Sequence, residues 1–149
     1  MYADDMKQKK EKSQMLTVSK ECHFDAAHVL TNHAGQCKNL HGHTYRLVVE
    51  VAESTEPSDM VMDFKDLKQV LREVILERFD HAFMYDESSA IERDIAETIA
   101  KHDMRRVALP FRTTAENLAR YFFNQLAPHV NILAVHLHES PESCATYSS

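Results

Sequence analysis

Two stretches of the chain alternate apolar and polar side chains, and they constrain the fold more than any other feature. Each carries apolar residues or histidines at every second position, which is the period of a β-strand. Lys20 is the one charged interruption. A loop containing Asn32, Gly35 and Gln36 separates them, so antiparallel pairing would bring the end of one strand beside the start of the other. The alternating residues are Leu16, Val18, Cys22, Phe24, Ala26 and His28 in the first stretch, and His41, His43, Tyr45, Leu47, Val49 and Val51 in the second.

The rest of the chain predicts helices, short strands and one longer strand. Helical periodicity indicates helices near residues 63–79, 90–102 and 113–127, with Asp63 as the first N-cap and Thr113 with Glu116 as a capping box for the third. Strands are expected at residues 60–62, 107–111 and 133–139. This order favours an α+β fold with an antiparallel sheet. With no repeat or linker, residues 16–149 should form one domain after a mobile charged tail at residues 1–15.

The composition excludes several classes of protein. A formal net charge of −6 argues against a nucleic-acid surface, which usually shows a basic excess. No apolar run approaches the roughly 20 residues needed to cross a bilayer, and the first residues lack the apolar core of a secretory signal. Three cysteines are too few for a disulfide scaffold and suit a reducing cytoplasm.

Three histidines predict a metal site where the two strands meet. His41 and His43 share one face of their strand, and their Cα atoms should lie roughly 6–7 Å apart. Gly42 between them leaves space or permits a bend. His28 ends the apolar face of the neighbouring strand. Three neutral imidazoles with one open position are typical of a catalytic zinc site.

Histidine pairs of this kind also occur by chance in a chain with ten histidines. The second pair, His136 and His138, alternates with Leu133, Val135 and Leu137, so we expect it to be solvated and to bind no metal. His41 and His43 instead share the apolar face, where an unpaired imidazole is costly. Both a metal site and ordinary strand histidines fit the spacing alone.

Other polar residues allow both catalytic and structural interpretations. Cys37, four positions before His41, could act as a general base or be an idle thiol. Asp80 and His81 could form a proton-transfer pair, although a cap in which His81 meets the helix dipole is the simpler local interpretation. Glu116 is most simply a capping residue.

Glu139 continues the apolar face of the last strand, where a carboxylate requires a partner. A heterocycle with two parallel N–H donors would satisfy it, and so would a buried salt bridge.

Several motifs together resemble the 6-pyruvoyl-tetrahydropterin synthase family, and more closely its bacterial branch, the 6-carboxy-tetrahydropterin synthases of queuosine biosynthesis. The resemblance runs from about Leu16 to Tyr147, and the three residues between Cys37 and His41 match the carboxy branch. The motifs are FDAAH (24–28), CKNLHGHTY (37–45), MDFKDLK (62–68), FDH (79–81), TAENLA (114–119) and HESPESCATY (138–147).

The resemblance implies the tunnelling fold: a four-stranded antiparallel sheet with helices packed on one face, closed into an oligomeric barrel. Two trimers would stack into a homo-hexamer with active sites at subunit interfaces. It also implies a zinc-dependent carbon–carbon lyase that converts 7,8-dihydroneopterin triphosphate to 6-carboxy-tetrahydropterin, acetaldehyde and triphosphate. A 6-pyruvoyl synthase and a non-catalytic zinc or pterin binder are the alternatives.

Matching positions assigns expected roles by resemblance. His28, His41 and His43 would bind zinc, and Cys37 would be the base, with Asp80 and His81 as a relay from a neighbouring subunit. Glu139 would anchor the pterin ring, with Thr114 and Glu116 lining the same pocket. Lys20, Lys38, Arg46 and Arg112 are open candidates for the triphosphate.

The chain departs from the family pattern at two places of interest. The stretch 82–112 is longer than expected, and Thr113 replaces a usual proline.

Overall fold

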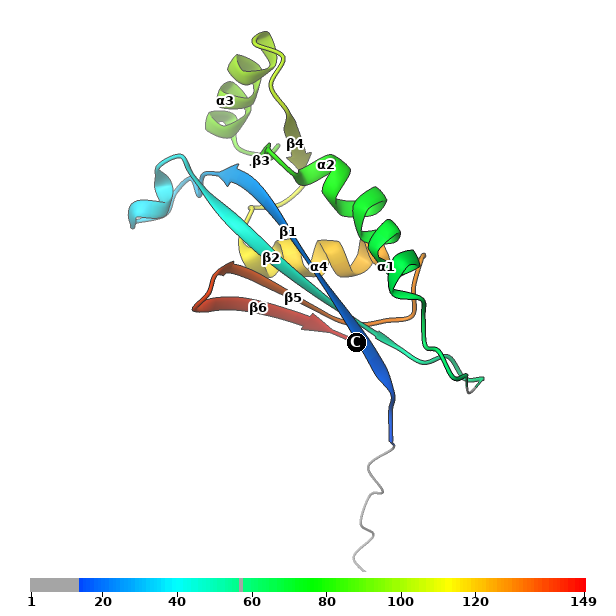
Figure 1. Ribbon diagram of the computed structural model, residues 1–149. Coiled ribbons are helices and arrows are strands. Elements are labelled where there is room, and N and C mark those ends of the chain that lie inside the picture. The colour runs from blue at the N-terminus through cyan, green and yellow to red at the C-terminus, as the bar shows by residue number, and fades with distance from the viewer. Residues whose placement is uncertain (1–13, 57) are drawn as a thin grey trace, which may run out of the picture.

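The computed structural model describes residues 14–56 and 58–149, so most of the predicted tail at residues 1–15 lies outside the described residues. The elements follow one another as a long strand pair, a segmented helix, a strand–helix–strand unit, a further helix and a final strand pair (Figure 1). Their bounds are β1 (Thr17–His28), η1 (Gln36–Lys38), β2 (His41–Ala52), α1 (Phe64–Leu71), η2 (Arg72–Leu76), α2 (Glu77–Phe79), β3 (Ala82–Asp86), α3 (Ala90–Lys101), β4 (Arg106–Leu109), α4 (Ala115–Leu126), β5 (Ile132–Ser140) and β6 (Ser143–Ser148).

Strands β1 and β2 pair antiparallel along their whole length, as their alternation predicted. The register runs from Thr17 opposite Ala52 to His28 opposite His41. Phe24, Tyr45 and Leu47 are buried on one face, while the residues between them are more exposed. Because side chains alternate between the faces of a strand, the register puts all three predicted metal ligands on the buried face.

The sheet has six strands in the order β4-β3-β1-β2-β5-β6 and is mixed, which corrects the predicted four-stranded antiparallel sheet. β1, β2, β5 and β6 do form antiparallel pairs, but β3 pairs parallel to β1 and β4 parallel to β3. The predicted strand at residues 60–62 is wrong, because these residues form neither helix nor strand. The predicted strand at 107–111 ends at Leu109.

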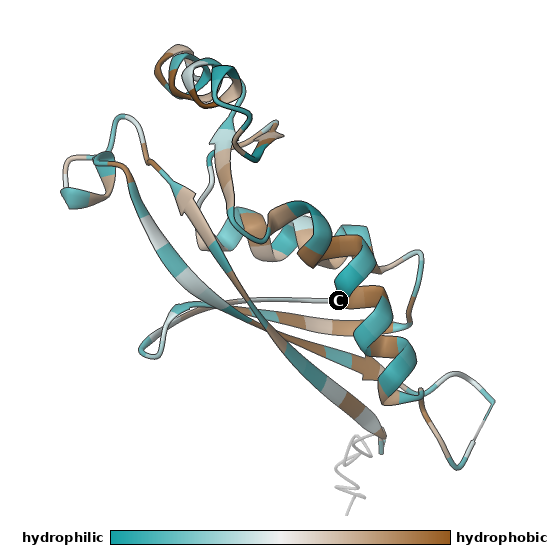
Figure 2. Ribbon diagram, turned by 45° about the horizontal axis from the view of Figure 1, so that its top comes forward, coloured by the Kyte–Doolittle hydropathy of each residue, from teal (hydrophilic) through white to brown (hydrophobic). Residues whose placement is uncertain are grey.

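The helices α1, η2, α2 and α4 cover one face of this sheet (Figure 1). Asp63 caps α1 by accepting a hydrogen bond from the Lys65 backbone N–H at 2.7 Å, as predicted. η2 is the π-helical segment between α1 and α2. Hydrophobic and hydrophilic bands alternate along the helix and strands (Figure 2). On the helix, the hydrophobic side chains Leu67, Leu71, Ile75 and Phe79 are buried in the main core.

Helix α4 begins one residue later than the sequence predicted. Thr114, not Thr113, is the N-cap, and its hydroxyl accepts a hydrogen bond from the Asn117 backbone N–H. Thr113 is instead fully buried in front of the helix. The predicted capping box of Thr113 with Glu116 is therefore wrong, and Thr113 is available for another contact.

Helix α3 packs on the opposite face of the sheet, which corrects the expectation that all helices lie on one face. Ala82 and Met84 join the main core, whereas Phe83 belongs to a second cluster with Val29 and Ala96 of α3. Adjacent residues of β3 point to opposite faces, so α3 and the main helices lie on different sides. Figure 1 shows α3 apart from α1 and α4, next to β3 and β4.

Among the described residues, none of the helices combines the length and the apolar character that a bilayer crossing requires.

Candidate metal centre and active site

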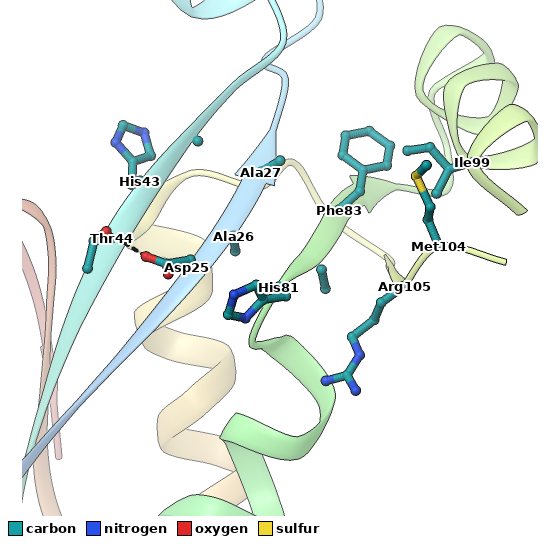
Figure 3. A pocket seen from close by; sticks show the side chains of 12 residues that line it. Asp25, Ala26, Ala27, His43, Thr44, His81, Phe83, Ile99, Met104 and Arg105 are labelled. Atoms are coloured by element: carbon teal, nitrogen blue, oxygen red, sulfur yellow. Dashed lines mark hydrogen bonds between the residues drawn. The ribbon is translucent and has the colours of Figure 1, made fainter. Parts of the chain in front are cut away.

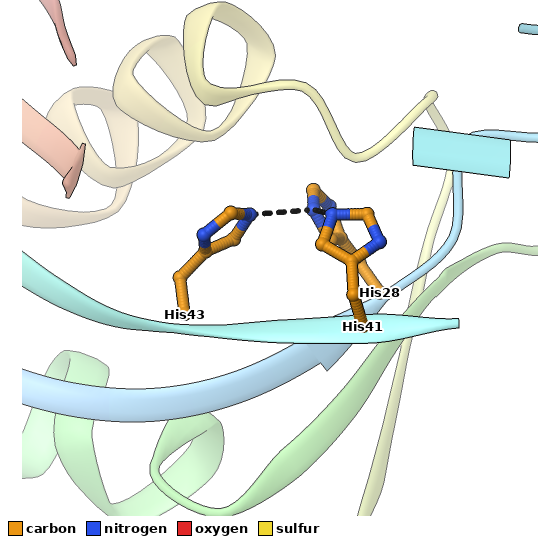
Figure 4. Close-up of side chains that lie close together, drawn as sticks. All are labelled: His28, His41 and His43. Atoms are coloured by element: carbon orange, nitrogen blue, oxygen red, sulfur yellow. Dashed lines mark hydrogen bonds between the residues drawn. The ribbon is translucent and has the colours of Figure 1, made fainter. Parts of the chain in front are cut away.

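Three imidazoles converge at the end of the β1–β2 pair, on the face covered by α4. The Nε2 atom of His28 lies 3.0 Å from Nε2 of His41 and 3.2 Å from Nε2 of His43 (Figure 4). His28 sits directly opposite His41 in the register, and His43 is opposite Ala26, which explains the convergence. Their ligand atoms all lie within 4.8 Å of one another, so the predicted grouping of these three histidines is confirmed.

Backbone carbonyls fix the outer nitrogen of two of these rings. His28 Nδ1 lies 2.8 Å from the Thr113 carbonyl oxygen, and His41 Nδ1 lies 2.7 Å from that of Asn39. A carbonyl can only accept, so each Nδ1 carries the proton and each Nε2 presents a lone pair to the other. Two lone pairs at 3.0 Å need a cation between them. The donor set therefore fits a divalent metal held by three neutral imidazoles.

The surroundings also favour the neutral form of two of the imidazoles, those of His28 and His43. Burial lowers the pKa of His28 from its ordinary 6.5 to about 4, the Thr113 carbonyl opposes this shift, and His41 and His43 add to it. Burial likewise lowers the pKa of His43, against the opposing charge of Glu139. Neutral imidazoles are the metal-binding form, so burial prepares His28 and His43 to bind a metal.

Gly42 allows the ligand strands to approach closely. A Cβ atom at this position would lie only 3.1 Å from the Ala26 carbonyl oxygen, which is backbone and cannot swing away. The absence of a side chain on this face lets β2 keep its register against β1. The glycine therefore supports the histidines on both sides of it.

Glu139 lies near the histidines on the same face, as its place on the strand predicted. Its charge acts on His43 and also raises the pKa of Tyr45, for which burial is the larger cause. Tyr45 is fully buried and its hydroxyl has no hydrogen-bond partner among the described residues. Glu116 and Glu139 line a shared cavity of about 90 Å³ between α4 and the β5–β6 turn. Thr114, the third predicted binding residue, caps α4 beside it.

Asp80 and His81 form a second cluster with Asp25, on the opposite face. His81 Nδ1 and the Asp25 backbone nitrogen each lie 3.0 Å from Asp80 Oδ1. The Asp25 carboxylate in turn accepts a hydrogen bond from the Thr44 hydroxyl (Figure 3). His81 lines a cavity of about 540 Å³ between β1 and the β3–α3 unit.

The capping interpretation of this pair is confirmed in part, and its role in proton transfer stays a prediction. Asp80 is the C-cap of α2, and His81 follows in the left-handed region with φ of 63°. The two side chains also contact each other and are 40% and 75% exposed, so they remain accessible. Asp25 and Thr44 were missed by sequence reasoning. Both residues alternate with core residues along their strands, and this spacing was the available signal that they share the face opposite the main core.

The structure does not bring Cys37 into either cluster. It lies in η1, within the β1–β2 loop, where its carbonyl accepts a hydrogen bond from the Leu30 backbone N–H at 2.9 Å. Its thiol is half-buried and free of a disulfide. The ligand atoms that meet at the metal centre are those of the three histidines, without the Cys37 sulfur. Its role as a base stays a prediction.

Two of the four triphosphate candidates contact other residues of the chain, and the second histidine pair lies away from the metal centre. Arg46 pairs with Glu21 at 3.0 Å, and Arg112 donates to the Thr31 carbonyl at 3.3 Å. His136 and His138 are half-buried rather than solvated, since β6 pairs beside them. The Nε2 atom of His136 lies 2.8 Å from the Glu50 carboxylate.

Comparison with known proteins gives a consistent result. The family described as 6-pyruvoyl tetrahydropterin synthase matches residues 17–149. A protein named 6-carboxy-5,6,7,8-tetrahydropterin synthase from Haemophilus influenzae is 44% identical, covering 89% of this chain and 99% of its own. A protein of the same name from Synechocystis is 33% identical over 76% of this chain and 98% of its own.

Solved structures agree with the fold. An uncharacterized protein from Wolinella succinogenes superposes with a TM-score of 0.78 at 20% identity, covering 92% of this chain and 99% of its own. The 6-pyruvoyl tetrahydropterin synthase of Caenorhabditis elegans gives a TM-score of 0.67 at 25% identity, covering 91% of this chain and 96% of its own.

The motifs had predicted both the family and its 6-carboxy branch, and the relatives confirm them. The chain belongs to the 6-pyruvoyl tetrahydropterin synthase family.

Proposed function

We propose that this protein is a zinc-dependent 6-carboxy-5,6,7,8-tetrahydropterin synthase, a carbon–carbon lyase of queuosine biosynthesis. Its substrates would be 7,8-dihydroneopterin triphosphate and water, and its products 6-carboxy-tetrahydropterin, acetaldehyde and triphosphate. The relative with 44% identity carries this synthase name and is matched over 99% of its length. The observation that carries the proposal is the convergence of three Nε2 atoms on one point beside Glu139.

His28, His41 and His43 would hold the zinc ion through Nε2. Bound there, zinc would supply Lewis-acid polarisation of the hydroxyls on the substrate side chain. The carbonyls of Thr113 and Asn39 support this role because they orient two of the rings and fix their tautomers.

Glu139 would bind the pterin ring next to the metal centre. A carboxylate has two oxygens that can accept parallel hydrogen bonds from the 2-amino group and N3–H of a pterin. Its place in one cavity with Glu116, beside Thr114 at the start of α4, supports a shared substrate pocket.

Cys37 would remove a proton from the substrate side chain, with Asp80 and His81 as the relay. The relay lies on the opposite face of the sheet from the metal centre, so one chain does not bring it to its own metal. This placement supports an active site completed by a second copy, in the predicted homo-hexamer of two stacked trimers.

The direct test is to incubate the purified protein with 7,8-dihydroneopterin triphosphate, with and without a chelator, and to identify the products by mass. We expect a carboxylated pterin with acetaldehyde, and loss of turnover on chelation that zinc restores. A product that retains all three side-chain carbons would instead identify a 6-pyruvoyl synthase.

The variant Cys37→Ala tests the proposed base in the same assay. It should abolish turnover and leave the zinc content unchanged, whereas Cys22→Ala, at a half-buried thiol of β1 that lines neither cavity, serves as the matched control. Unchanged turnover in Cys37→Ala would remove this thiol from the mechanism. Absence of any turnover in the wild type, with zinc still bound, would favour a zinc or pterin binder.

A further inference from the structure

Arg105 reaches from the α3–β4 connection to the turn that carries Asp80 and His81. Its Nη1 atom donates hydrogen bonds to the carbonyl oxygens of Glu77 at 2.8 Å and Asp80 at 3.0 Å. Its own carbonyl accepts a hydrogen bond from the Phe83 backbone N–H at 3.0 Å. Arg105 therefore contacts the chain both before and after His81 (Figure 3).

The turn between α2 and β3 has features that call for such contacts. Helix α2 ends at Phe79, and its last carbonyls lack partners within the helix. A cation near this end also interacts favourably with the helix dipole. His81 is a non-glycine residue with φ of 63°, a conformation that costs about 1–3 kcal/mol and persists only when its surroundings hold it.

Two sets of contacts hold this conformation from opposite sides. On one side, the His81 backbone N–H donates to the Asp25 carbonyl at 2.7 Å, and the Asp25 N–H donates to Asp80 Oδ1 at 3.0 Å. On the other side, Arg105 binds the Asp80 carbonyl. The Asp80 peptide is thereby fixed at both its carbonyl and its side chain.

We propose that Arg105 is a positioning residue that holds the Asp80–His81 pair in its working geometry. The inference rests on the proposed function for the role of that pair, but the contacts themselves are independent of it. The arginine comes from the extended 82–112 stretch, so this stretch contributes to the turn as well as adding α3 and two strands.

The neighbouring Arg106 provides a matched control. It is also exposed and begins β4, but among the described residues its guanidinium reaches only the Met104 carbonyl, at 3.5 Å. Loss of Arg106 should therefore leave the turn intact. A difference between the two variants reports on the contacts of Arg105 and not on the loss of a positive charge from this region.

The experiment compares Arg105→Met, Arg105→Lys and Arg106→Met with the wild type. Misplacement of a reacting group by about 1 Å can cost about 100-fold in rate. We expect kcat to fall by about 10- to 100-fold in Arg105→Met with KM and zinc content little changed. Arg105→Lys, which keeps a donating cation at the helix end, should recover part of the loss, and Arg106→Met should match the wild type.

Hydrogen exchange at the His81 backbone amide gives a second readout that needs no activity. It should be faster in Arg105→Met than in the wild type and unchanged in Arg106→Met. An unaltered exchange rate in Arg105→Met would overturn the inference, whether or not the wild type is active. Absence of lyase activity in the wild type would refute the proposed function, and the exchange measurement would still test Arg105. With an active wild type, an unchanged kcat, or an equal loss in Arg106→Met, would also overturn the inference.

Discussion

The two clusters of titratable side chains lie on opposite faces of the sheet and differ in how far they are exposed. The metal centre occupies the helix-covered face, where His28 is 1% exposed and two backbone carbonyls orient the rings. The Asp25–Asp80–His81 cluster occupies the other face, where the His81 side chain is 75% exposed and borders an open cavity.

This difference shows that one chain completes the metal centre by itself but does not complete a site that uses both clusters. Within one chain, fixed tautomers prepare the lone pairs of His28 and His41 for a metal, and His43 supplies a third nitrogen beside them. The second cluster has a defined backbone geometry, and its imidazole contacts Asp80 but stays largely exposed. A site that needs both clusters therefore needs a second copy of the chain, or a substrate that reaches around the sheet edge.

Removal of one imidazole should have the largest effect. In His41→Ala, only two nitrogens remain at the metal centre, so we expect metal affinity to fall by more than about 100-fold, beyond the usual loss for an outer-shell partner. Equilibrium dialysis with metal analysis would measure this. The control is His136→Ala, in the other histidine pair, which should bind metal normally. Equal metal binding in the two variants would refute the assigned centre.

Asp80→Asn should impair turnover without touching the metal. Asparagine keeps an acceptor oxygen for the Asp25 N–H but loses the charge that faces His81. Because general acid–base groups contribute about 10²–10⁴-fold, we expect kcat to drop by at least about 100-fold. Steady-state kinetics with parallel zinc determination would show it, with exposed Asp66→Asn as the control. Loss of zinc together with activity would contradict the separation of the two clusters.

Acidification should destabilise the metal-free protein through His28. Its pKa is about 4 in the folded chain and 6.5 ordinarily, so between these values the unfolded state binds more protons and stability falls as pH falls. Between pH 7 and pH 5 this one group should remove about 2 kcal/mol of unfolding free energy. Urea titrations of chelator-treated protein would test this: the loss should shrink in His28→Gln and persist in exposed His129→Gln. An identical pH dependence in both variants would reject the assignment.

Periodicity was a sufficient guide where one face of an element is buried. It predicted β1, β2, α1 and the shared face of the three histidines, because burial of one face requires alternation. It failed at β3, where Ala82, Phe83 and Met84 are all buried because the main core covers one face and α3 covers the other. A strand covered on both faces shows no alternation. β6 was missed because SCATYS is short and largely polar.

The candidate site was predictable only as far as side chains define it. The histidines share a face by spacing, but the carbonyls of Thr113 and Asn39 that orient them belong to the backbone, which carries no residue signature. The position of Asp80 and His81 depends on a parallel pairing of β3 with β1, a long-range contact that no local pattern encodes. Arg105 contacts the turn through the backbone carbonyls of Glu77 and Asp80, so no sequence motif marks its role.

The smallest expected effect concerns the glycine between two of the ligands. In Gly42→Ala, the new methyl would press on the Ala26 carbonyl at 3.1 Å, so β1 and β2 must separate slightly. Overpacking of this kind costs about 1 kcal/mol or somewhat more. The same shift would move His41 and His43 away from His28 and weaken metal binding several-fold.

Gly35→Ala is the matched control for this change. Its Cβ would also meet an atom at 3.1 Å, but that atom is the end of the exposed His33 side chain, which can rotate away. Thermal unfolding and metal titration should therefore leave Gly35→Ala near the wild type and Gly42→Ala below it. Equal behaviour of the two would mean that close approach of the ligand strands does not set the geometry of the metal centre.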